Sequence, residues 1–128
     1  MSAPPPSAAD MKGKRGLTRL WNAARYSIKG IAAAWRSEEA FRQEVLLVMA
    51  AAPLGLWLGE NGVERALLVG SVLLILIVEL LNSALEAIVD KASPEMHELA
   101  GRAKDMGSAA VLISLVLAAT VWILTLFF

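Results

Sequence analysis

The sequence contains no cysteine and a single histidine. It therefore offers neither a disulfide framework nor a thiolate metal site. Two glycine-rich patterns are also missing, Gly-x-x-x-x-Gly-Lys-[Ser/Thr] and Gly-x-Gly-x-x-Gly, which excludes the conventional nucleotide-binding folds. The net charge of the 128 residues is zero, and we expect no nucleic-acid partner. The amino-terminal residues lack the apolar core of a signal peptide, so membrane entry is expected to depend on internal segments.

Charge is also missing from long stretches of the chain, which are apolar instead. Hydrophobic residues make up 57% of the sequence, and they are clustered rather than dispersed as in a globular core. The clusters predict membrane spans at about 38–59, 63–90 and 104–128, each of about 20 residues or more. The turn Glu60-Asn61-Gly62 and the helix break Ser93-Pro94 separate these spans. We therefore predict an all-α membrane protein.

The basic residues are unevenly distributed, and their positions predict the orientation of the spans. Of the twelve Lys and Arg residues, eight precede Glu44 and three lie between Lys91 and Lys104. Because short loops rich in Lys and Arg stay in the cytoplasm, we expect the amino terminus and the 91–104 loop to be cytoplasmic. Three spans with a cytoplasmic amino terminus are consistent with the distribution of Lys and Arg in every segment.

The region before the first span divides into a tail and a helix. Residues 1–15 are rich in Pro, Ala and Ser and are predicted to be disordered. Residues 17–36 have the pattern of an amphipathic surface helix, with tryptophans at headgroup depth and cations on the other side. This helix is either a membrane anchor alone or an anchor whose basic face also closes a site for an anionic cofactor. Ser37 is expected to cap the helix that follows.

Four polar side chains share one face of the second predicted span, because helical residues advance by about 100° each. They are Glu79, Asn82, Glu86 and Asp90. Carboxylates at bilayer depth are costly and persist mainly where they line a cavity, bind an ion or perform chemistry. For Asn82 and the neighbouring Ser83, hydrogen bonding between helices remains an alternative to a catalytic role.

Glu79 and Glu86 are expected to have different tasks. They are separated by about 10 Å along the helix axis, at about 1.5 Å per residue, which is too far to clasp one ion directly. The deeper Glu79 suits a general base that takes a proton from a hydroxyl. The shallower Glu86, together with Glu38, suits Mg²⁺, which favours one or two carboxylates plus phosphate oxygens and water.

A second group of polar residues opens the third predicted span. Residues 95–107 combine acids, two cations and the single histidine, and they could meet a nucleotide whose phosphates also use helix amino-terminal amides. The alternative is a solvated loop whose cations serve only the topology.

Three helices cannot wall off a large pocket alone, so polar residues in their middles also predict that several copies associate.

Four motifs follow one another along the chain. They are Ala33-Ala34-Trp35, Glu38-x-Ala40-Phe41-Arg42-Gln43-Glu44, Glu79-x-x-Asn82-Ser83-Ala84-x-Glu86-x-x-Val89-Asp90 and His97-Glu98-Leu99-Ala100-Gly101-Arg102-Ala103-Lys104-Asp105-Met106-Gly107-Ser108-Ala109-Ala110-Val111. Together they closely resemble the small bacterial integral-membrane diacylglycerol kinases. The resemblance covers about residues 16–128 and leaves only the Pro-rich tail outside it.

This resemblance implies an enzyme that transfers the γ-phosphoryl group of ATP to the free hydroxyl of diacylglycerol, giving phosphatidic acid. It also implies a homotrimer in the bacterial inner membrane, with composite sites at the cytoplasmic face. Glu79 would be the general base, Asn82 would help to orient the hydroxyl, and Glu38 and Glu86 would carry Mg²⁺ with the ATP phosphates. The nucleotide would contact Arg19, Tyr26, Lys29, Glu95, Met96, His97, Lys104 and Asp105, whereas Trp35 and Ser108 would lie near the lipid.

Other functions remain open on the sequence alone. Enzymes of the same architecture prefer undecaprenol, a long-chain alcohol, and the two substrates are poorly separated by sequence. A small proton- or cation-coupled carrier would also explain intramembrane glutamates, although not the clustered cations. A regulatory or scaffold subunit is a third interpretation. For a kinase we expect direct in-line transfer, since no residue resembles an activated nucleophile.

Overall fold

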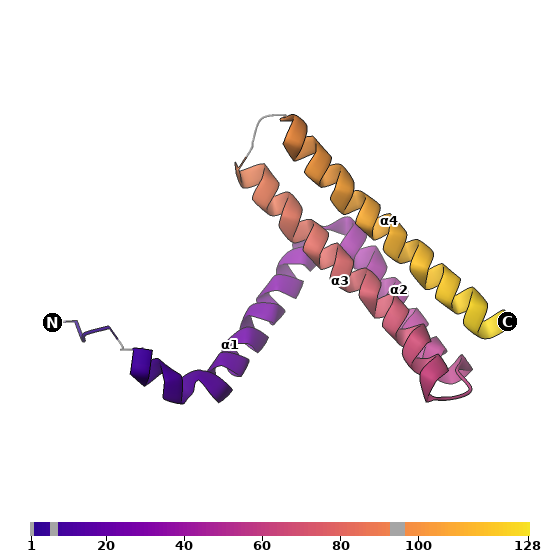
Figure 1. The fold of residues 1–128 in the computed structure, drawn as a ribbon, viewed down its shortest axis with the longest axis horizontal. Helices are drawn as coiled ribbons and strands as arrows, with labels where there is room; N and C mark the ends of the chain where they lie inside the picture. Colours follow the sequence, from indigo (N-terminus) through magenta and orange to yellow (C-terminus); the bar gives the residue numbers. More distant parts are fainter. Residues whose placement is uncertain (1, 6–7, 93–96) are drawn as a thin grey trace. The chain divides into compact units, whose positions relative to one another are not determined.

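The computed structural model describes the backbone of residues 2–5, 8–92 and 97–128, and the side chains of residues 2–5, 16–92 and 97–128. Over these residues the chain forms α1 (Ala8–Ser37), α2 (Glu39–Leu58), α3 (Gly62–Ala92) and α4 (Glu98–Phe127) (Figure 1). Contacts divide the chain into two units, Met1–Ala33 and Ala34–Phe128. The second unit holds the end of α1, all of α2 to α4, and the candidate site.

The first helix is longer than predicted. It begins at Ala8 rather than at residue 17, so the expectation of a disordered tail over 1–15 is wrong for residues 8–15. Ala, Met, Lys and Arg occupy most of that stretch, and all four favour helix. At its other end, α1 includes Ser37, and Glu38 takes the cap position of α2 with extended backbone and no side-chain capping bond. The prediction that Ser37 caps the second helix is therefore wrong.

α2 and α3 form a helical hairpin through a tight turn, as the sequence predicts. Asn61 Oδ1 accepts a hydrogen bond from the Glu64 backbone N–H (2.9 Å), and Glu64 Oε2 accepts one from the Glu60 N–H (2.8 Å). The first bond satisfies a donor that the first turn of α3 leaves unpaired, and the second fixes the residue at the start of the turn. Arg65 Nε donates back to the Leu56 carbonyl at 3.1 Å and so ties the start of α3 to the end of α2.

α4 begins earlier than predicted. It starts at Glu98, because His97 adopts extended backbone and its Nδ1 accepts a hydrogen bond from the Leu99 N–H at 3.1 Å. The predicted loop 91–104 is thus mostly helical: residues 91–92 end α3 and residues 98–104 open α4. The predicted break at Ser93-Pro94 lies outside the described residues.

α3 packs against both α2 and α4 (Figure 1). Among the described residues of this second unit, the buried apolar side chains are Ala34, Phe41, Val48, Leu68, Val72, Ile75 and Ala118. Two close contacts set the spacing at the end far from the candidate site: Gly55 lies against Leu68, and Trp122 Nε1 donates to the Leu68 carbonyl at 3.0 Å. A Cβ at Gly55 would come within 3.0 Å of the Leu68 Cβ, so α2 approaches α3 closely because that residue has no side chain.

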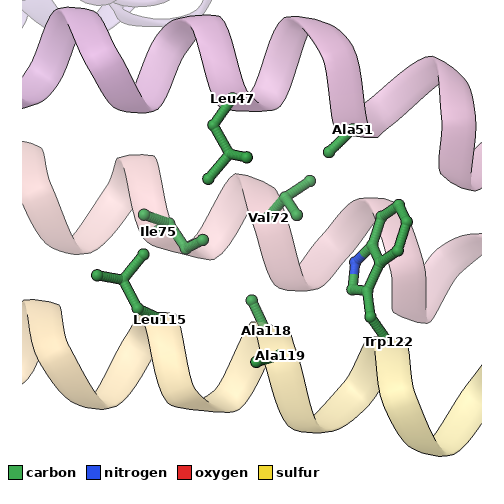
Figure 2. A pocket seen from close by; sticks show the side chains of 8 residues that line it. All are labelled: Leu47, Ala51, Val72, Ile75, Leu115, Ala118, Ala119 and Trp122. Carbon is green, nitrogen blue, oxygen red and sulfur yellow. The ribbon is translucent and has the colours of Figure 1, made fainter.

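An apolar cavity of about 310 Å³ lies between the three helices (Figure 2). Leu47 and Ala51 line it from α2, Val72 and Ile75 from α3, and Leu115, Ala118, Ala119 and Trp122 from α4. Many other large apolar side chains point outward; Trp57 is 78% exposed and Phe127 is 76% exposed. Outward apolar surface of this extent suits lipid rather than water.

α2, α3 and α4 are each long and apolar enough to cross a membrane, with 20, 31 and 30 residues. A span needs roughly 20 apolar residues to cross a hydrocarbon core of roughly 30 Å. The prediction of a helical membrane protein with three spans is therefore confirmed at the level of length and composition.

Candidate active site

A second cavity, of about 360 Å³, lies between the same three helices and is lined by acidic and apolar side chains together. Its lining residues are Glu38, Ala40 and Glu44 at the start of α2, Glu79, Asn82 and Glu86 on α3, and Ser108, Val111, Leu112 and Leu115 on α4. Five residues that the sequence analysis named thus line one cavity: Glu38, Glu79, Asn82, Glu86 and Ser108. Leu115 also lines the apolar cavity, so the two cavities adjoin.

Glu79 is the most deeply buried acid of this cavity. Only 4% of its surface is exposed, whereas Glu38 and Glu86 are half-buried. Glu79 lies one turn along α3 from the buried Ile75, so the apolar stripe that packs α3 also directs this carboxyl inward. Its charge interacts with those of Glu38 and Glu86. These three acids of the cavity therefore differ in their exposure to solvent.

Asn82 connects two parts of the cavity wall. Its Nδ2 donates to Glu86 Oε1 at 3.5 Å, one turn along α3. Its Oδ1 is buried and has no hydrogen-bond partner among the described residues. The carboxamide lies against Gly107 of α4, where a Cβ would overlap Oδ1. Asn82 is therefore held against α4, is hydrogen-bonded to Glu86, and keeps an acceptor oxygen without a partner among the described residues.

Glu44 lines the cavity although the sequence interpretation did not include it among the site residues. It lies between Phe41 and Val48 on the buried face of α2, and its Oε2 is buried without a hydrogen-bond partner among the described residues. A signal was present in the sequence: positions 41, 44, 48 and 55 follow the spacing of one helical face. Glu44 belongs to this otherwise apolar face of α2 and therefore lies toward the neighbouring helices rather than toward solvent.

The residues expected to bind the nucleotide are more scattered. Lys104 Nζ forms an ion pair of 2.5 Å with Asp90 Oδ1, and both side chains are substantially exposed. Asp105 is exposed one residue further along α4, and His97 caps that helix. Glu95 and Met96 lie outside the described residues. Neither Lys104 nor Asp105 lines the cavity.

The remaining predicted contacts lie on α1. Arg19, Tyr26 and Lys29 belong to the first unit and are exposed, and the Lys29 ammonium lies 6.0 Å from the centre of the Tyr26 ring. Trp35 belongs to the second unit, where its carbonyl accepts a hydrogen bond of 2.7 Å from Arg42 Nη1. It does not line the cavity. A contribution of these four residues to the site stays a prediction.

The carboxylates of the cavity fit a metal ion only if other ligands come from outside the protein. Among the described residues, no group of three or more His, Cys, Asp or Glu is placed to hold a metal ion. A cage built wholly by this part of the chain is therefore not present. Two carboxylates on one cavity, Glu38 and Glu86, fit Mg²⁺ that takes its other ligands from phosphate and water.

Three helices long and apolar enough to cross a membrane, with a carboxylate-lined cavity between them, define a small helical membrane protein with an acidic site. Comparison with known proteins identifies it further. The prokaryotic diacylglycerol kinase family matches residues 25–126. The chain is 53% identical over 111 residues to the diacylglycerol kinase of Escherichia coli (strain K12), covering 87% of this chain and 91% of the relative.

Two further relatives are similar over nearly their whole lengths. The diacylglycerol kinase of Haemophilus influenzae is 49% identical over 113 residues, covering 88% of this chain and 96% of the relative. That of Pseudomonas aeruginosa is 49% identical over 116 residues, covering 91% and 94%. This chain belongs to the prokaryotic diacylglycerol kinase family. The resemblance noted in the sequence is thereby confirmed.

Proposed function

We propose that this chain is an ATP-dependent diacylglycerol kinase, which transfers the γ-phosphoryl group of ATP to the free hydroxyl of diacylglycerol to give phosphatidic acid. The observation that carries the proposal is the cavity in which buried Glu79 meets half-buried Glu38 and Glu86. Family membership supports the same activity. The adjoining apolar cavity supports an acceptor with a hydrocarbon chain, since it offers such a chain a surface beside the acids.

Glu79 is the general base of the proposed reaction. Its carboxylate takes the proton of the lipid hydroxyl while that oxygen forms a bond to the γ-phosphorus. The bond from the γ-phosphorus to the bridging oxygen breaks, and its electron pair leaves with ADP. Phosphoryl transfer depends mainly on positioning and charge neutralisation, and Asn82 supplies positioning through its free Oδ1. Transfer is direct and in line, without a phosphorylated protein.

Glu38 and Glu86 are the residues that would hold Mg²⁺ together with the ATP phosphates. When bound, the metal neutralises phosphate charge. Asn82 donates to Glu86 Oε1, which holds that carboxylate in one orientation, as partners of metal ligands commonly do.

Lys104 and Asp105 would contact the nucleotide, with Glu95, Met96 and His97 before them and with Arg19, Tyr26 and Lys29 from α1. Lys104 is exposed and cationic, as a phosphate contact requires, and its partner Asp90 keeps it at the same end of the bundle as Glu86. Trp35 and Ser108 would lie near the lipid. Ser108 supports this by its place on the cavity wall.

The surface and the charges of the chain support a proposed setting for the enzyme. The residues that precede the spans form an amphipathic helix at the membrane surface, and the amino terminus and the site face the cytoplasm from the bacterial inner membrane. The enzyme is a homotrimer whose neighbouring subunits complete each site. Exposed apolar side chains on all three spans supply surface for such association as well as for lipid.

The test is an assay of purified protein with γ-labelled ATP, Mg²⁺ and diacylglycerol in mixed micelles. We expect label in the lipid extract as phosphatidic acid. Preferential labelling of undecaprenol in a parallel reaction would contradict the assigned substrate. Ion flux in vesicles without any labelled lipid would instead support a carrier. A phosphorylated protein that forms and decays at the turnover rate, captured by rapid quench, would contradict direct transfer.

A further inference from the structure

The junction between α1 and α2 consists of one residue, Glu38, which belongs to the second unit. α1 ends at Ser37, α2 begins at Glu39, and Glu38 has extended backbone between them (φ −120°, ψ 108°). Its N–H donates to the Ala34 carbonyl at 2.9 Å, and its carbonyl accepts from the Arg42 N–H at 3.3 Å. Glu38 therefore closes one helix and opens the next.

The place of the Glu38 carboxyl group depends on this junction. Inside a helix, the helical backbone sets the direction of a side chain, whereas the direction at Glu38 follows from its own φ and ψ. The side chain makes no capping bond, and it lines the acidic cavity together with Glu79 and Glu86 of α3. A change in the backbone at Glu38 would therefore move this acid relative to the other two.

Arg42 joins the two sides of the junction through its side chain. Its Nη1 donates to the Trp35 carbonyl at 2.7 Å and to the Arg36 carbonyl at 3.4 Å. The last turn of a helix leaves carbonyls without donors from that helix, and the helix dipole favours a cation there. Arg42 lies one turn after Glu38 and the two carbonyls lie just before it, so these bonds restrain the backbone at Glu38 from both sides.

We propose that Arg42 is a positioning residue, which holds the Glu38 carboxyl group in the cavity by clamping the junction between α1 and α2. This inference rests on the proposed function, in which Glu38 is a ligand of Mg²⁺. Arg42 does not line the cavity, so it acts through the backbone rather than through contact with phosphate or lipid. Bonds from a guanidinium are charge-assisted and stronger than bonds between neutral groups, which suits a clamp.

The first experiment measures the junction in the absence of metal and nucleotide. Amide hydrogen exchange over residues 34–42 is compared for the wild type, Arg42→Met and Arg42→Lys in detergent. Methionine keeps an unbranched chain but has no donor, so the amides of Glu38 and Arg42 should exchange roughly 10-fold faster, as expected for the loss of a charge-assisted hydrogen bond. Lysine donates to the same carbonyls and should keep most of the protection.

The second experiment measures the metal site with Mn²⁺ in place of Mg²⁺. Binding of Mn²⁺ in the presence of a non-hydrolysable ATP analogue is followed by electron paramagnetic resonance. Arg42→Met should weaken it by roughly 10-fold, as changes to the partners of metal ligands do, whereas Arg42→Lys should retain most of the affinity. In the micelle assay, the Mg²⁺ concentration for half-maximal activity should rise in Arg42→Met, and the KM for the lipid should stay unchanged.

Arg65 offers a matched control at the other end of α2. Its Nε donates to the Leu56 carbonyl at 3.1 Å across the turn between α2 and α3, and it does not line the acidic cavity. Arg65→Met therefore removes a bond of the same kind and should leave Mn²⁺ binding unchanged. If Arg42→Met does not yield folded protein, Arg42→Gln takes its place, since its shorter, neutral side chain does not span the same distance.

Three outcomes would overturn the inference while leaving the proposed function intact. Mn²⁺ binding in Arg42→Met that is no weaker than in Arg65→Met removes the link to Glu38. Weaker Mn²⁺ binding with unchanged amide exchange makes Arg42 a direct contact of the phosphates, and a raised KM for the lipid alone makes it a lipid contact. Failure of the wild type to bind Mn²⁺, with exchange still faster in Arg42→Met, contradicts the proposed metal role of Glu38 and leaves the clamp itself supported.

Discussion

The carboxamide of Asn82 on α3 lies directly against Gly107 on α4, and a Cβ at position 107 would overlap Asn82 Oδ1 and come within 3.2 Å of Cγ. α4 can approach the cavity only because this residue has no side chain. The same carboxamide donates to Glu86. The absence of a side chain at Gly107 therefore leaves room for the carboxamide that contacts Glu86, a proposed metal ligand on α3.

Gly107→Ala should lower activity without weakening the fold much. The added methyl group displaces Asn82 and with it Glu86, and misplacement by about 1 Å can cost on the order of 100-fold in rate. We expect kcat/KM to fall by at least about 10-fold, measured in the micelle assay. Gly70→Ala is the control, because nothing lies within 4 Å of a Cβ there. Equal activity of the two variants would contradict the positioning argument.

Glu79→Gln should abolish turnover and leave ATP binding largely intact. The amide keeps the size of the side chain but cannot accept the hydroxyl proton, and loss of a general base costs about 10²–10⁴ in rate. Turnover and equilibrium binding of a fluorescent ATP analogue measure the two effects separately. Glu60→Gln, in the exposed turn between α2 and α3, should alter neither. Normal lipid phosphorylation by Glu79→Gln would remove the base from the mechanism.

Glu86→Gln should change the response to magnesium. We expect the Mg²⁺ concentration for half-maximal activity to rise by roughly 10-fold or more, as for changes at or beside metal ligands. A magnesium titration of initial rates measures this shift. The division of tasks along α3 predicts no such shift for Glu79→Gln, whose Mg²⁺ dependence is measured by binding of the fluorescent ATP analogue because its turnover is lost. An equal shift in both variants would mean that the two acids act together on the metal.

The Lys104–Asp90 ion pair should matter for nucleotide binding rather than for stability. Both side chains are exposed, at 43% and 63%, and solvent screens pairs of this kind. Asp90→Asn is therefore expected to leave the unfolding temperature in detergent unchanged. Lys104→Met should raise the KM for ATP several-fold, because it removes a cation from the phosphates. Loss of stability in both variants, with an unchanged KM, would make the pair structural.

Trp122→Phe should cost stability without changing the chemistry. The indole donates to the Leu68 carbonyl at the end of the bundle away from the acids, and a partly buried hydrogen bond of this type contributes about 1 kcal/mol. Thermal unfolding in detergent should show a lower transition for Trp122→Phe than for Trp57→Phe, whose parent side chain is 78% exposed. Unequal catalytic activity of the two variants would link Trp122 to the site.

The helices were predictable because their signals are local. Charge-free runs of sufficient length predict spans, and the Glu60-Asn61-Gly62 turn separates two of them. The ends were less accurate: α1 begins at Ala8 and α4 at Glu98, earlier than expected in both cases. Helix ends depend on caps such as the His97 side chain, whose energies are small and depend on neighbouring geometry.

The candidate site was predictable only in part. Glu79, Asn82 and Glu86 share a face of one helix, so periodicity alone groups them. Periodicity cannot say which residues of α2 and α4 meet that face, since this depends on the rotation of each helix about its axis. Glu44 was missed for that reason, because one acid among apolar neighbours on α2 becomes significant only when it lines the same cavity as Glu79 of α3.

By itself, the order of residues along this chain determined three apolar helices, a row of acids on the second of them, and the family. These are properties of single segments, because length, composition and a period of about 3.6 residues are local quantities. Only the tertiary structure decided that Glu38, Glu44 and Ser108 join the row of acids around one cavity, and that Gly107 admits Asn82. Such contacts arise from side chains that pack between helices, and the residue pattern of one helix does not specify which residues of the neighbouring helices it contacts.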